Sequence, residues 1–131
     1  MLTTLAIPRP GADEHLPYYG KYIAQVPGDD AMATLSTHIA SWHPALRKLT
    51  EAQALHRYAP GKWSVKEVLG HLCDGERVFT YRALRFARAD ATPLPGFDEN
   101  TWVPNSGADR RPIADLADEL LAVRAATVVL F

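Results

Sequence analysis

The stretch GKWSVKEVLGHLCDGERVFTYRALRFARADATPLPGFDEN, residues 61–100, decides how the rest of the chain is organised. Ser64 and Glu67 form an S-x-x-E capping box just before an apolar-periodic run, and each side chain can accept the backbone N–H of the other residue. No proline occurs again until Pro93, so the box predicts a helix that runs to about Ala89. A loop punctuated by proline and glycine follows.

A helical wheel of this segment, at about 100° per residue, puts most of its large apolar side chains on one arc. We expect that arc to be buried: Val65, Val68, Leu69, Leu72, Phe79, Ala83 and Phe86. Glu76 falls inside it, so its carboxylate should be buried and hydrogen-bonded, either to the 90–111 loop or near a cleft. His71 lies at the edge of the arc beside Arg82. Such a histidine is either a satisfied helix residue, the commoner case, or a ligand that points into a cleft.

The remaining sequence predicts an all-α bundle in one domain, residues 1–131, with three main helices near 30–49, 64–89 and 112–131. Asp29 or Asp30 caps the first helix, which Pro44 should kink or break. Residues 1–28 are expected to form an irregular arm, since prolines and glycines recur closely. The 90–111 loop should be ordered. Its Asp98, Glu99 and Asn100 either face a metal-bound water or a substrate, or cap a short helical turn.

The composition argues against several classes of function. The 131 residues carry a net charge of −1, and the sequence lacks the basic surface that direct nucleic-acid binding needs. A single cysteine rules out an intramolecular disulfide and suits a reducing cytoplasm. The N-terminus lacks a basic region followed by an apolar core, so we expect no signal peptide, and no apolar run reaches membrane-spanning length. We therefore expect a cytoplasmic protein without direct contact to nucleic acid or membrane.

The motifs GKWSVKEVLGHLCDGERVF and YRALRFARADATPLPGFDEN, in this order, resemble the DinB-like (DinB/YfiT-like) superfamily of metalloenzymes. The resemblance covers nearly all of the chain, although the family name refers to DNA damage and the charge pattern above does not favour DNA binding. It implies an up-down-down-up four-helix bundle that holds a divalent transition metal (Zn, Ni or Fe). His71 matches the histidine on the second family helix. An H-x-x-x-H pair on the last family helix has no counterpart here. We therefore expect a C-terminally truncated chain that lacks the last helix.

The resemblance also implies a function. Related family members include transferases and isomerases that use a low-molecular-weight thiol such as bacillithiol or mycothiol. The resemblance therefore implies a metal-dependent transferase or hydrolase, with such a thiol as one candidate co-substrate, and it does not identify the substrate. In this chain Glu76, Arg82, Asp98, Glu99 and Asn100 are candidates for the surroundings of the metal or the substrate loop. With only His71 as a ligand, the chain should bind metal weakly or not at all and be inactive, unless two copies of His71 meet across a homodimer. The alternative is a non-catalytic, stress-associated bundle that acts through dimerisation. The apolar end Val128–Phe131 suggests truncation or an intermolecular contact.

Overall fold

The computed structural model describes residues 5–131, and this part of the chain is all-α, as the sequence predicts. Three long helices carry the fold: α2 (Ala31–Arg47), α4 (Val65–Ala87) and α6 (Ile113–Leu130). Four short elements connect or precede them: α1 (Pro17–Ile23), α3 (Glu51–Ala54), α5 (Glu99–Asn105) and the 3-10 helix η1 (Ala108–Arg110). The three long helices agree with the three expected main helices to within a few residues.

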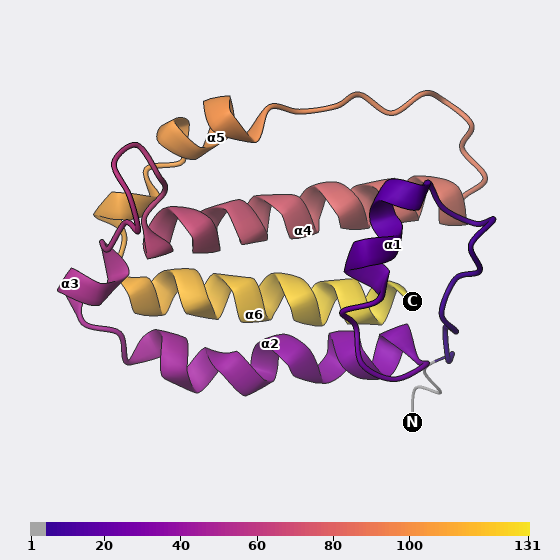
Figure 1. The fold of residues 1–131 in the computed structure, drawn as a ribbon, viewed down its shortest axis with the longest axis horizontal. Helices are drawn as coiled ribbons and strands as arrows, with labels where there is room; N and C mark the ends of the chain where they lie inside the picture. The colour runs from indigo at the N-terminus through magenta and orange to yellow at the C-terminus, as the bar shows by residue number, and fades with distance from the viewer. Residues whose placement is uncertain (1–4) are drawn as a thin grey trace.

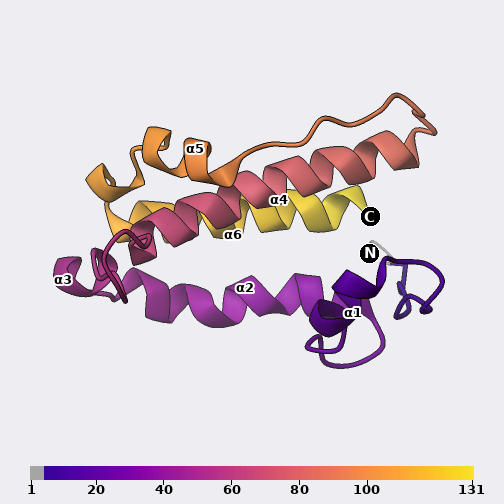
Figure 2. The same ribbon diagram turned by 45° about the horizontal axis from the view of Figure 1, so that its top comes forward.

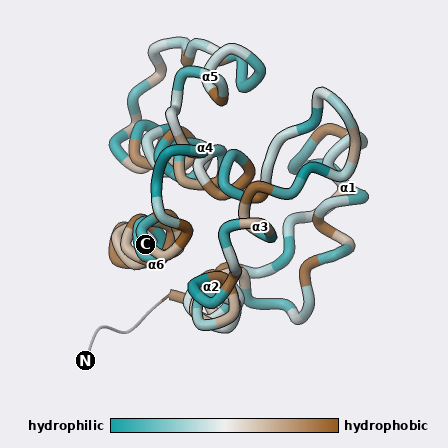
Figure 3. The backbone as a smooth tube through the Cα atoms, turned by 90° about the vertical axis from the view of Figure 1, so that its left-hand side faces the viewer, coloured by the Kyte–Doolittle hydropathy of each residue, from teal (hydrophilic) through white to brown (hydrophobic). Residues whose placement is uncertain are grey.

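Helix α6 is the central element of the bundle. It packs against both α2 and α4, and the three helices run alongside one another for most of their length (Figures 1 and 2). Seen end-on, they occupy the corners of a triangle, with α1 and α3 on the side away from α6 (Figure 3). Because α1 and α3 lie at opposite ends of the bundle, the middle of the α2–α4 face is left without a covering helix (Figures 1 and 3).

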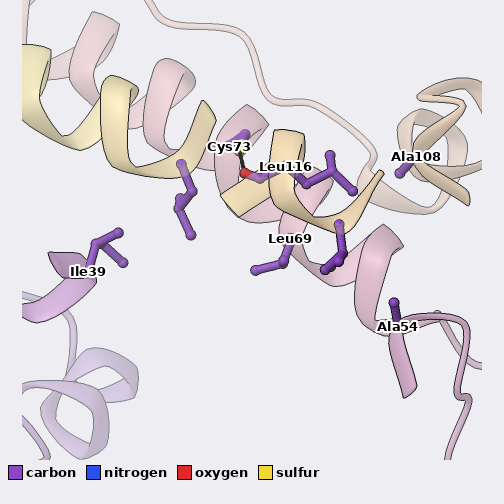
Figure 4. Packing of buried hydrophobic residues seen from close by; sticks show 8 residues of the cluster. Ile39, Ala54, Leu69, Cys73, Ala108 and Leu116 are labelled. Atoms are coloured by element: carbon purple, nitrogen blue, oxygen red, sulfur yellow. Dashed lines mark hydrogen bonds between the residues drawn. The ribbon is translucent and has the colours of Figure 1, made fainter. Parts of the chain in front are cut away.

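The buried core lies where the three helices meet at the α3 end of the bundle (Figure 4). Leu116 and Leu120 of α6 are 0% and 1% exposed and face Leu69 and Cys73 of α4. Helix α4 and η1 also approach each other closely here. A Cβ built at Gly70 would lie only 3.2 Å from the Cβ of Ala108, which shows how near the two elements are. Members of the core cluster come from five elements: Ile39, Ala54, Leu69, Cys73, Ala108, Ile113, Leu116 and Leu120.

The face of α4 that the wheel predicts to be buried is only partly so, and this expectation is wrong for four of its seven residues. Leu69 is buried, but the exposed fractions are 41% for Val68, 39% for Leu72, 63% for Phe79 and 72% for Phe86. The reason is that α6 contacts α4 on a neighbouring face, through Cys73, the Glu76–Arg124 ion pair and the Thr80–Thr127 hydrogen bond. The apolar arc therefore faces the uncovered side of the bundle.

Two other expectations need correction. The arm is not irregular throughout, because Pro17 starts α1, at a position where proline is favoured. Of the kink or break expected at Pro44, the break does not occur, because α2 continues through Pro44 to Arg47. The 90–111 segment is ordered as predicted and contains α5 and η1. Residues 90–98 run back along α4 (Figures 1 and 2), where Arg85 donates to the carbonyl of Thr92 at 3.2 Å.

Candidate functional site

A network of polar and charged groups holds the start of α4 and so fixes the residues that follow. Ser64 Oγ accepts the backbone N–H of Glu67 at 3.0 Å, and the Glu67 carboxylate accepts that of Ser64 at 2.9 Å, which confirms the capping box. The Ser64 hydroxyl also donates to Asp109 of η1. Lys66 is 2% exposed, and its ammonium group donates to Glu51 of α3 at 2.6 Å. The first turn of α4 is thus tied to two other elements.

His71 lies in the second turn of α4 and is half-buried. Its ring packs on the indole of Trp63, with centroids 4.9 Å apart and an angle of 50° between the ring planes. Within residues 5–131, neither ring nitrogen of His71 forms a hydrogen bond. Ring packing therefore orients the histidine while its two nitrogens keep their capacity to bind a ligand.

The indole of Trp63 also forms part of the wall of a cavity of about 690 Å³ between α2, α4 and the 55–63 loop. Its walls are largely aromatic and aliphatic, and three polar side chains add hydrogen-bonding groups. The apolar lining consists of Trp42, Leu46, Tyr58, Trp63, Val65, Val68, Leu69 and Leu72, and the polar lining of His56, Lys62 and Asn100. Ligand sites in proteins commonly have this size and this mixture of groups.

Glu76 is hydrogen-bonded, as expected, but it is half-buried rather than buried, and its partner belongs neither to the 90–111 loop nor to a metal cleft. Its two oxygens accept from Arg124 of α6 at 2.7 and 3.0 Å, and both side chains are 14% exposed. Burial alone would raise the pKa of Glu76, but the hydrogen bonds and positive charge of Arg124 outweigh it, so the pKa lies below its ordinary value. Arg124 also donates to the carbonyl of Leu35 at 3.3 Å and so joins all three long helices.

Asp98 caps α5, which settles one of the two roles that its sequence position left open. Its carboxylate accepts the backbone N–H of Asn100 at 3.0 Å and the hydroxyl of Thr101 at 2.7 Å. These hydrogen bonds hold the pKa of Asp98 below its ordinary value, with the Thr101 hydroxyl making the larger contribution. Glu99 lies in the first turn of α5. Of the three tip residues, Asn100 lines the cavity.

Arg82 holds the returning segment in place. It donates to the carbonyl of Pro95 at 3.1 Å, and its guanidinium lies 5.4 Å from the centroid of the Phe79 ring. Phe97 and Trp102 anchor the same segment through a ring contact of 4.6 Å. The candidates Glu76, Arg82 and Asp98 therefore each have a structural partner of their own, and they do not gather around His71.

The remaining histidines and the cysteine take structural positions or lie in the cavity wall. His43 binds Asp118 at 2.6 Å, and His38 packs on Trp42 with ring centroids 4.1 Å apart. Cys73 is 1% exposed, and burial raises the pKa of its thiol to about 12, which agrees with a role in packing. Residues 5–131 contain no group of three or more His, Cys, Asp or Glu side chains that could hold a metal ion.

Sequence reasoning missed the aromatic walls of the cavity. Trp63 had a local signal, because it directly precedes the capping box in the deciding stretch. Trp42 and Tyr58 had none, since only the packing of α2 and the 55–63 loop brings them to α4. The pairing of Arg124 with Glu76 could have been predicted, because each is a charged residue within an otherwise apolar helix face. A buried charge on each of two packed helices predicts an ion pair.

None of the helices described for residues 5–131 is long and apolar enough to cross a membrane.

The comparisons with known proteins point to one family. No curated protein and no solved structure matches the chain. The family model described as the DinB superfamily matches residues 24–130, which include α2, α4, α6 and the segments between them. The chain therefore belongs to the DinB superfamily.

Proposed function

We propose that this chain belongs to a divalent-metal-dependent enzyme, a transferase or hydrolase acting on a small molecule, in which His71 is a metal ligand. The observation that carries the proposal is the ring contact of His71 with Trp63, a residue of the cavity wall, together with two ring nitrogens that form no hydrogen bond within residues 5–131. A histidine kept for packing alone would more often donate to a carbonyl or carboxylate, as His43 does to Asp118.

The residues present do not by themselves fit a transition metal. Such sites take three or four protein ligands, and within the described residues no three suitable side chains come together. The other donors would have to come from outside residues 5–131. What these residues offer is a rigid position for one imidazole, since the capping box and the Lys66–Glu51 pair fix the start of α4.

The cavity beside Trp63 supports a small-molecule substrate. Trp42, Tyr58 and Trp63 provide apolar walls, while Lys62 and Asn100 offer a positive charge and an amide. This lining suits a molecule with an apolar body and one anionic or carbonyl group. A low-molecular-weight thiol, which the family resemblance implies as co-substrate, carries such groups as well.

Metal binding tests the role of His71. We expect Co²⁺ or Zn²⁺, titrated into the 131-residue chain, to perturb the imidazole NMR signals of His71 with weak affinity. His71→Ala should abolish that binding, whereas His56→Ala, which changes a histidine of the cavity wall, should retain it. Binding that survives in His71→Ala would refute the assignment. Tight, stoichiometric binding by the monomeric chain would refute the account of missing donors.

A non-catalytic bundle that acts by association is the second candidate, and one observation favours it. Phe79 and Phe86 are 63% and 72% exposed on α4, although phenylalanine is strongly favoured in interiors. On this reading His71 is a packing residue, and His71→Ala changes neither metal binding nor association. The same titration therefore separates the two candidates.

A further inference from the structure

A second cavity, of about 370 Å³, lies between α4 and the returning segment, on the side of α4 away from α2 (Figures 1 and 3). We call it the outer pocket. Of the residues that the structure describes, none lines both this pocket and the larger cavity beside Trp63. Asp74, Arg77 and Arg82 of α4 supply its charged groups. Its apolar walls come from α4, the returning segment and α5: Val78, Tyr81, Leu94, Pro95, Phe97 and Trp102.

The wall opposite α4 is held in place at both ends. Arg85 donates to the carbonyl of Thr92 at 3.2 Å, which ties the start of the returning segment to α4. At the other end the rings of Phe97 and Trp102 pack on each other, with centroids 4.6 Å apart. Between these anchors lies Gly96, where an added Cβ would meet no atom of the described chain within 4 Å. The outer pocket is therefore formed before any ligand binds, as small-molecule sites usually are.

The charges around the outer pocket leave one guanidinium group uncompensated. At one end Arg77 and Arg111 both bind Glu119, each at 2.6 Å. Asp74 adds a second carboxylate at this end, so two acids balance two guanidinium groups. At the other end Arg82 has no carboxylate within 4 Å among residues 5–131. Since Asp74 and Arg82 are about 12 Å apart along the helix axis, the pocket has a distinct positive end.

Arg82 is oriented to bind an anion at that end. Its Nη2 donates to the carbonyl of Pro95 at 3.1 Å, and its guanidinium lies 5.4 Å from the centroid of the Phe79 ring. These contacts fix the plane of the group and, within the described residues, engage one of its five N–H donors. The remaining donors can hold a carboxylate through two parallel hydrogen bonds. An anion bound here would also lie in a site with apolar walls, where a charged hydrogen bond is stronger than in water.

We propose that the outer pocket is a second ligand site, which binds a small organic carboxylate with a flat, apolar body. The carboxylate binds the guanidinium of Arg82, and the body packs among Val78, Phe97 and Trp102. A volume of about 370 Å³ lies near the small end of the range for ligand sites, and Asp74 disfavours a second anionic group at the far end of the ligand. None of the described residues of this pocket is a histidine, so the proposal does not depend on the metal-dependent function.

Three probes with one common apolar body test the charge preference: 2-naphthoate, neutral 2-naphthalenemethanol and cationic 2-naphthylmethylammonium. The tryptophans report where each probe binds, because Trp102 lines the outer pocket, whereas Trp42 and Trp63 line the larger cavity. In the isotope-labelled 131-residue chain, we expect 2-naphthoate to shift the indole N–H NMR signal of Trp102 with a dissociation constant below about 1 mM. The ammonium probe should bind about tenfold more weakly.

Substitution of Arg82 tests the role of its guanidinium. Arg82→Gln should raise the dissociation constant of 2-naphthoate about tenfold, because a hydrogen bond between two charged groups is lost. Binding of 2-naphthalenemethanol should stay nearly unchanged, which would show that the pocket is still formed. Arg82→Lys keeps the charge and should retain more affinity than Arg82→Gln. Arg88→Gln is the matched control, since it removes the same charge from an exposed residue at the end of α4 that does not line the pocket, and it should change neither constant.

Three results would each overturn the proposal. The first is a Trp102 signal that 2-naphthoate does not shift, whether or not the signals of Trp42 and Trp63 move. The second is tighter binding of the ammonium probe than of 2-naphthoate, which would assign the pocket to a cation held by Asp74. The third is an unchanged affinity of Arg82→Gln for 2-naphthoate, which would show that Arg82 only holds the returning segment.

Discussion

The Glu76–Arg124 ion pair offers a direct test of how this bundle is held together. Arg124 binds both carboxylate oxygens of Glu76 and also reaches the carbonyl of Leu35, so one side chain links α2, α4 and α6. Replacing Glu76 by Gln keeps the shape and one acceptor but leaves the positive charge of Arg124 uncompensated. Replacing it by Ala removes both acceptors.

The expected cost follows from the burial of the pair. Removing one partner of a fully buried pair costs about 3–5 kcal/mol, and exposed pairs contribute about 0.2–1 kcal/mol. Because Glu76 and Arg124 are each 14% exposed, their pair lies towards the buried end of this range. We expect about 1–2 kcal/mol for Glu76→Gln and about 2–3 kcal/mol for Glu76→Ala. For a chain of this size, 2 kcal/mol corresponds to a fall in Tm of about 8 °C.

Urea and thermal unfolding at one fixed protein concentration measure these costs. Arg77→Gln is the control, because Arg77 is 54% exposed in its pair with Glu119 and should cost at most about 0.5 kcal/mol. The double variant Glu76→Leu/Arg124→Leu should recover much of the loss, since it leaves neither charge unpaired.

The pH dependence supplies an independent check. The pKa of Glu76 is lower in the folded chain than its ordinary value of 4.5, so its contribution to stability is fully present above about pH 4.5. It is lost as the pH falls through the folded pKa. The difference in unfolding free energy between the unaltered chain and Glu76→Gln should therefore shrink in acid. A Gln variant as stable as the parent at pH 7, or a difference that does not change with pH, would refute this reasoning.

Two further predictions concern α4. Burial raises the pKa of the Cys73 thiol to about 12, so the folded chain should not react with a thiol reagent at pH 8, whereas the unfolded chain should. Fast reaction of the folded chain would contradict the buried position of Cys73. Ser64→Ala should destabilise the chain by about 1–2 kcal/mol, because it removes a helix cap and a part-buried hydrogen bond to Asp109. Thr50→Ala, at the exposed capping box of the four-residue α3, should cost less, and equal costs would show that burial of Ser64 contributes nothing.

Local chemistry explains what the sequence could predict. A capping box acts over three residues, so Ser64 and Glu67 mark the start of α4 whatever surrounds them. Asp30, one of the two aspartates expected to cap α2, does so by accepting the backbone N–H of Met32. The burial of Lys66 could not be predicted from its own segment. Its ammonium group is stabilised by Glu51, fifteen residues earlier, and only the fold brings the two together.

In the candidate site, too, the sequence predicts local features but not the contacts that the fold determines. The wheel placed His71 at the border of the apolar arc, and in the structure its ring packs on Trp63, a residue of the cavity wall. Arg82 had the right helical position to accompany His71, but its guanidinium binds the carbonyl of Pro95. That contact depends on the path of the 90–98 segment. Side-chain partners across such distances are set by tertiary packing, which a wheel does not contain.

The wrong assignment of the buried face is itself informative about α4. An apolar stripe of helical period indicates which surface a helix buries in its final assembly, and α6 already occupies the neighbouring face through Cys73, Glu76 and Thr80. Full burial of a phenylalanine contributes about 1.5–3 kcal/mol, which Phe79 and Phe86 largely forgo in the single chain. A charge at Phe79 should therefore leave the unfolding free energy of the single chain almost unchanged, which urea unfolding of Phe79→Glu would measure. A core residue would not tolerate this change, because a charge buried in a core without a partner is strongly destabilising.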